Sequence, residues 1–62
     1  MFAYIECIDR SEYANVPTRR INVNDISQEE INAKIYSLRE SLNKWGFDIV
    51  LSEYEDEKET LI

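Results

Sequence analysis

The chain has 62 residues, of which 44% are hydrophobic and 11% are aromatic, and its 13 acidic and 7 basic side chains give a net charge of −6. A chain of this length forms one domain at most, and this apolar fraction is too high for a fully disordered protein. The negative charge argues against direct binding to nucleic acid, because that affinity comes from lysine and arginine side chains that displace counterions.

One cysteine and no histidine restrict the chemistry that the sequence can carry. A single cysteine cannot build an internal disulfide framework, and without histidine a structural zinc site is close to excluded. The opening Met-Phe-Ala-Tyr-Ile lacks the basic residues of a signal peptide, and no apolar run approaches the roughly 20 residues that span a membrane. We therefore expect a cytoplasmic protein with no cofactor, no metal and no membrane contact.

The first predicted element is a strand over Phe2 to Ile8, a stretch rich in residues that favour strands. Both of its faces are largely apolar, which is typical of a central strand rather than an edge strand. Asp9 to Pro17 follows as a polar connection, in which Tyr13 and Val16 are candidates to fold back onto the sheet. A central first strand needs partners on both sides, and these must come from later in the chain.

Thr18 to Val23 is predicted to be the second strand, and it is short and charged as edge strands usually are. Arg19 and Arg20 form a basic pair within it. We expect these arginines to pair across the sheet with Glu6 or Asp48, in preference to binding an external phosphate or acidic partner.

The strongest local pattern predicts a helix from about Gln28 to Trp45. Ser27 and Glu30 have the spacing of a capping box, and Gly46, the only glycine, suits the left-handed residue that ends a helix. Apolar residues recur at helical spacing along this stretch and form one stripe: Ile31, Ile35, Leu38, Leu42 and Trp45. This apolar stripe is too short to argue for a coiled coil. Leu38, its middle residue, is the predicted centre of the core.

Phe47 to Tyr54 is predicted to be the third strand, followed by a solvated acidic tail over residues 55–62, with Leu61 and Ile62 available to pin its end. The element order is thus β-β-α-β. It predicts a single small α+β domain over residues 1–54, with a three-stranded mixed sheet in the order 2-1-3 and one helix packed on one face.

Two groups of side chains deserve comparison with catalytic and metal sites. Cys7 has no histidine to activate it and has apolar neighbours, so we interpret it as an inert core residue. A cluster of carboxylates near the C-terminus lacks the glycine turn and ligand spacing of a calcium loop, so we interpret it as solvated charge. We therefore do not expect an enzyme. The carboxylates are Glu53, Glu55, Asp56, Glu57 and Glu59.

The predicted sheet face opposite the helix is the feature that these structural interpretations leave unexplained. Its side chains are apolar or aromatic, and no second helix is predicted to cover them: Phe2, Tyr4, Ile8, Val50 and Tyr54. A contiguous patch of this kind marks an interaction site. Either the loop that contains Tyr13 and Val16 covers it, or it meets a second copy or another protein.

Two functions fit these observations. The first is a small acidic, non-catalytic protein that occupies a partner protein's surface, such as the basic groove of a nucleic-acid-handling enzyme, as inhibitors from phages and mobile elements do. The second is a homodimeric accessory subunit that uses the apolar face as its own symmetric interface. The predicted partner-binding residues are Phe2, Tyr4, Val50, Tyr54, Glu53, Glu55, Asp56, Glu57 and Glu59.

Overall fold

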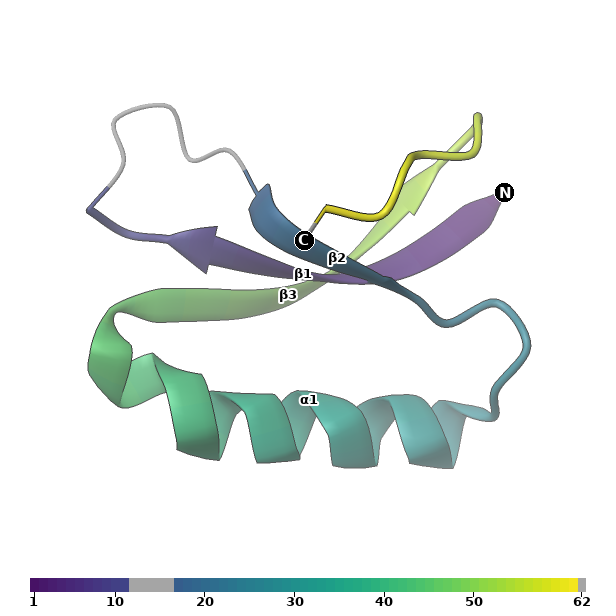
Figure 1. Cartoon of the computed structure of the whole chain (residues 1–62). Helices are drawn as coiled ribbons and strands as arrows, with labels where there is room; N and C mark the ends of the chain where they lie inside the picture. The colour runs from purple at the N-terminus through teal and green to yellow at the C-terminus, as the bar shows by residue number, and fades with distance from the viewer. Residues whose placement is uncertain (12–16, 62) are drawn as a thin grey trace.

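A computed structural model describes residues 1–11 and 17–61, and the elements follow in the order β1 (Phe2–Asp9), β2 (Pro17–Asn22), α1 (Gln28–Leu42), the 3₁₀ turn η1 (Asn43–Trp45) and β3 (Phe47–Tyr54). The strands form one sheet in the order β2-β1-β3, and α1 lies across one of its faces (Figure 1). The predicted α+β fold and strand order are confirmed. Both ladders are antiparallel, so the hydrogen bonding is antiparallel rather than mixed, although β2 and β3 run in the same direction.

Strand β1 is central, as its two apolar faces predicted. It pairs with β3 along its whole length, from Phe2 opposite Tyr54 to Asp9 opposite Phe47. Its other edge pairs with β2, and an irregularity in register follows Cys7. The first strand of the chain is therefore stabilised by the last one.

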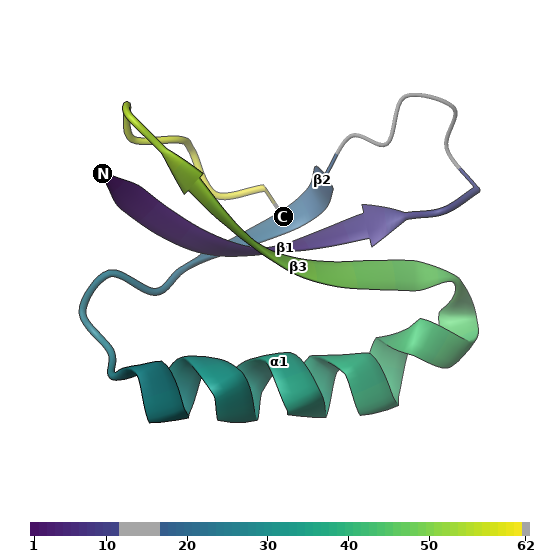
Figure 2. The ribbon, with the colours of Figure 1, turned by 180° about the vertical axis from the view of Figure 1, so that it is seen from behind.

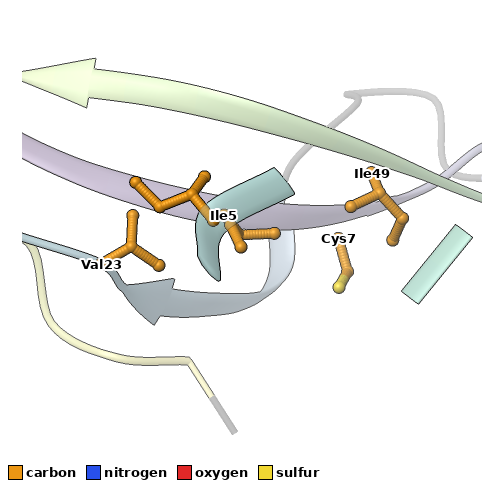
Figure 3. Close-up of a cluster of buried hydrophobic side chains, with 5 residues drawn as sticks. Ile5, Cys7, Val23 and Ile49 are labelled. Carbon is orange, nitrogen blue, oxygen red and sulfur yellow. The ribbon is translucent and has the colours of Figure 1, made fainter. Parts of the chain in front are cut away.

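The core lies between the sheet and α1, and its buried side chains are Ile5, Cys7, Val23, Ile31 and Ile49. Figure 3 shows Ile5, Cys7, Val23 and Ile49 together at this cluster. Ile31, near the start of α1, is 7% exposed, whereas Leu38 packs against the cluster and is only partly buried. The prediction that Leu38 is the centre of the core is therefore wrong, because the helix is most deeply buried near its N-terminal end.

The two ends of α1 differ in how closely they follow the sequence pattern. The cap is confirmed, since the Ser27 hydroxyl accepts a hydrogen bond from the Glu30 N–H at 3.2 Å. The α-helix ends at Leu42 and η1 leads to Gly46, whose φ is +91° and whose N–H donates to the Asn43 carbonyl. Trp45 is 71% exposed, so its predicted place in the core is wrong.

The inner side of this turn is filled by other residues. Leu42 and Phe47 pack against the core on either side of η1. Leu51 lies opposite Ile5 on the outer strand β3 and is 41% exposed, so the cover that α1 provides does not reach it. The period of the apolar pattern therefore identified the inward face but not the extent to which α1 covers it.

Residues 55–61, here called the C-terminal segment, turn back after β3 and cross the sheet face opposite α1, here called the second face (Figures 1 and 2). Most of their side chains are exposed, as expected of a solvated acidic stretch. Their backbone, however, is hydrogen-bonded to the sheet. The segment is thus a layer on the second face rather than a tail extended into solvent.

Candidate partner-binding surface

Four side chains from the three strands meet on the second face, beneath the C-terminal segment. Strand alternation and the pairing of Glu6 with Arg20 place these two residues there with Tyr4 and Tyr54. Tyr4 is 1% exposed and Glu6 is 2% exposed. We call this group the Glu6 cluster: Tyr4, Glu6, Arg20 and Tyr54.

The Glu6 carboxylate is buried as an ion. Arg20 Nε donates to Glu6 Oε2 at 2.9 Å, and the Tyr54 hydroxyl donates to the same oxygen at 2.7 Å. Burial by itself raises the pKa of Glu6, but hydrogen bonds from Tyr54, Ser52 and Arg20, with the charge of Arg20, outweigh it and lower the pKa below its ordinary value. The predicted pairing of Arg20 with Glu6 is confirmed.

The same contacts affect the partners of Glu6. Its hydrogen bond is the main cause that raises the pKa of Arg20 and the pKa of Tyr54. The two tyrosine rings pack edge to face with centroids 5.9 Å apart, and the Arg20 guanidinium lies 5.8 Å from the Tyr4 centroid and 5.5 Å from the Tyr54 centroid. The carboxylate is thus held ionised by fixed donors, which is the geometry of a structural ion pair.

The C-terminal segment is held on this cluster mainly through its backbone. The Tyr4 hydroxyl accepts from the Lys58 N–H at 3.0 Å and donates to the Lys58 carbonyl at 3.3 Å. Arg20 Nη1 donates to the Glu59 carbonyl at 2.8 Å, and the Lys58 ammonium lies 5.4 Å from the Tyr54 ring centroid. These contacts also explain why Tyr4 is buried.

The expectation of an uncovered second face is therefore wrong at its centre. Tyr4 is buried under the C-terminal segment, and Tyr54 is partly buried beside it. The alternative cover, the loop with Tyr13 and Val16, lies outside the described residues. Self-association through this face would require the segment to move away first.

The predicted partner-binding residues fall into two groups. Phe2, Val50 and Tyr54 are partly buried, and Tyr4 is buried. The acidic members are all exposed: Glu53, Glu55, Asp56, Glu57 and Glu59. Their contact with a partner remains a prediction, but the acidic group is the more accessible of the two.

Four exposed carboxylates follow closely on one another at the end of β3 and just after it. In Figure 2 the end of β3 and the bend after it lie at the top of the molecule, whereas the start of α1 lies at the bottom, so Glu29 and Glu30 in the first helical turn are not part of this group. Among the described residues, the ion pairs join Arg10 to Asp48 and Arg20 to Glu6, so these four carboxylates have no such partner there. We call this surface the acidic end: Glu53, Glu55, Asp56 and Glu57.

The sequence predicted all four members of this surface as partner-binding residues. It did not predict that the segment carrying three of them folds back onto the second face, because the hydrogen bonds that hold this segment join residues 54 positions apart.

Other exposed apolar side chains are scattered over the surface. Tyr36 is 66% exposed on α1, and Trp45 and Leu51 lie on η1 and β3. Tyr36 was not singled out by the sequence, because a lone aromatic outside the apolar stripe carries no pattern. Single exposed apolar residues are ordinary on protein surfaces and do not by themselves define a site.

Cys7 is 1% exposed, as predicted, and burial raises the pKa of its thiol despite the nearby charge of Arg19. Within residues 1–11 and 17–61, no three histidine, cysteine or acidic side chains are grouped so that they could hold a metal ion. In the same residues, no helix has the length and apolar character needed to cross a membrane.

Comparisons with protein-family models, with curated proteins and with solved structures found no match.

Proposed function

We propose that this chain is a small, non-catalytic binding protein whose acidic end occupies a basic surface of a partner protein. The observation that supports this function is the succession of four exposed carboxylates at the end of β3 and the start of the C-terminal segment. Like charges held close together repel one another, and an approaching arginine or lysine surface relieves that repulsion. A basic surface built to hold phosphates is the closest chemical complement.

The attachment of the C-terminal segment favours this proposal. Lys58 and Glu59 are bound through their backbone, so the preceding carboxylates Glu55, Asp56 and Glu57 are presented between two fixed points, the end of β3 and the Glu6 cluster. A charge arrangement that is already ordered loses less conformational entropy on binding than a free tail does. This is the difference between a mimic of a charged ligand and a merely solubilising stretch.

A nucleic-acid-handling enzyme is the class of target that we expect, because its groove selects first for negative charge. The protein would then act by competing with nucleic acid for the groove. We further propose that it works in the cytoplasm, an expectation supported by its single cysteine, which lies in the core as a free thiol.

Affinity capture from the native host, at low and at raised salt, tests the proposal. Captured proteins should be released by salt and by added nucleic acid. With the purified partner, neutralising Glu53, Glu55, Asp56 and Glu57 together should slow association at low salt by about tenfold or more, since charge complementarity acts mainly on the association rate. The same variant should show a weaker dependence of binding on salt.

A one-charge comparison supplies the matched control. Glu57→Gln should slow association, whereas Glu40→Gln, which neutralises an exposed carboxylate on α1 outside the acidic end, should leave it nearly unchanged. Equal effects of the two substitutions would show that only net charge matters. Capture that resists both salt and neutralisation would rule out the acidic end as the binding surface.

A further inference from the structure

The contacts between the second face and the C-terminal segment resemble those of a receptor with an extended peptide. One hydroxyl, that of Tyr4, binds both the N–H and the carbonyl of Lys58, and Arg20 binds the next carbonyl, that of Glu59. Backbone groups are present in every peptide, so these three hydrogen bonds fix an extended chain without selecting its sequence.

One side chain adds selectivity. The Lys58 ammonium lies 5.4 Å from the Tyr54 ring centroid, within the range of a cation–π contact. Further along, Leu61 is partly buried and lines, with Ile21, a groove of about 640 Å³ between β2 and the segment. The face thus has a position for a cationic side chain and, three residues later, a position for an apolar one.

The C-terminal segment and the domain on which it lies carry net charges of the same sign. Residues 55–61 carry four acidic side chains and one basic side chain, or −3 of the total −6, so the rest of the chain also carries −3. The net charges of the segment and of the rest of the chain therefore have the same sign, which adds a long-range repulsion at low salt. An extended peptide with the same lysine but without the carboxylates would make the same contacts and be attracted instead.

We infer that the second face is a binding site for an extended, lysine-containing basic peptide, and that the C-terminal segment occupies it as a weak internal substitute. The site is separate from the acidic end, and it does not depend on the function proposed for that end. A partner peptide would displace residues 58–61 and place its lysine over Tyr54. The acidic end would remain attached through β3.

A peptide titration tests this inference with the full chain. The probe is a synthetic peptide with the sequence of residues 55–62 in which the acidic residues are replaced by Gln or Asn. The protein variant Lys58→Pro removes both the N–H that binds Tyr4 and the ammonium that lies over Tyr54. The probe should bind this variant at least about tenfold more tightly than it binds the wild type, whose site is occupied most of the time.

Two controls make the result specific. Lys34→Ala makes the same change in net charge on α1 and should bind the probe as the wild type does. A probe with alanine in place of its lysine should bind the Lys58→Pro variant roughly threefold more weakly, because it lacks the cation–π contact. In amide NMR spectra, the shifted signals should include those of Tyr4, Arg20 and Tyr54.

The wild-type protein gives a second measurement that does not depend on any variant. Saturating probe should shift the Lys58 amide signal, because its hydrogen bond to Tyr4 is lost. The inference is overturned if millimolar probe leaves that signal unchanged, or if the shifted signals lie away from the Glu6 cluster. Equal binding of the lysine and alanine probes would overturn the assignment of the cationic position.

Discussion

Replacing Arg20 by methionine is the sharpest test of the Glu6 cluster. Methionine retains much of the aliphatic length but leaves the Glu6 carboxylate, 3% exposed at its side chain, without its cation. Removing one partner of a buried ion pair costs about 3–5 kcal/mol, because the remaining charge is still desolvated. A domain of 62 residues has a free energy of unfolding of about 3–9 kcal/mol in total. Arg20→Met should therefore remove most of the stability.

The dependence of this cost on pH identifies Glu6 as its source. In the wild type the pKa of Glu6 is lowered, so its stabilising contribution is present above the unfolded pKa and is lost as pH falls through the folded pKa. Without Arg20, burial should raise the pKa of Glu6 above the unfolded value. Protonation of Glu6 at acidic pH then removes the cost of its buried charge. The difference in free energy of unfolding between variant and wild type should therefore be smaller at about pH 4 than at about pH 7.

Urea denaturation at both pH values, monitored by circular dichroism, measures these differences in the free energy of unfolding. Arg19→Met is the matched control, since it removes an exposed arginine from the same strand and should cost within about 0.5 kcal/mol. The double variant Glu6→Leu with Arg20→Met removes both charges and should recover much of the loss. A cost below about 1 kcal/mol for Arg20→Met, or an equal cost at both pH values, would refute this account of the cluster.

Further expectations concern the helix ends, the core and the thiol. Ser27→Ala should lower the free energy of unfolding by roughly 0.5–2 kcal/mol in urea melts, because the N-cap hydrogen bond is lost. Gly46→Val should cost about 1 kcal/mol or more, because a β-branched residue is strained at φ +91°. A steric clash does not contribute, because no atom lies within 4 Å of the added Cβ. An unchanged melting temperature would contradict this expectation. Ile31→Ala should cost about 2–5 kcal/mol and more than Leu38→Ala; the reverse order would contradict the observed core. Cys7 should react with a thiol reagent far more slowly in the native protein than in denaturant, because its thiol is buried and its pKa is raised; equal rates would contradict the burial.

The fold was predictable because its main signals are local. The Ser27 cap, the left-handed Gly46 and the alternation along Phe47–Tyr54 each follow from residues that are close together in sequence. The central place of β1 followed from its two apolar faces, and the order 2-1-3 is confirmed. These features depend on backbone preferences and periodicity, and neither requires knowledge of distant contacts.

The candidate site was harder to predict because it depends on contacts between distant residues. Tyr4 and Lys58 are 54 positions apart, and their hydrogen bonds join a side-chain hydroxyl to a backbone. Such a contact leaves no periodic trace in the sequence. The same limit explains Trp45, which fits the apolar stripe by spacing but follows the point at which the α-helix gives way to a 3₁₀ turn.

The position of β1 has a consequence for how the molecule acquires its structure. Its first pairing with β3 joins Phe2 to Tyr54, so the longest ladder closes a loop of nearly the whole described chain. Chains with such distant contacts lose more entropy before the contacts form, and they fold more slowly than helical domains of equal size. During synthesis, β1 emerges first and must wait for β3. Until then its apolar residues remain exposed to other chains, and the stage most prone to aggregation precedes the synthesis of the last strand.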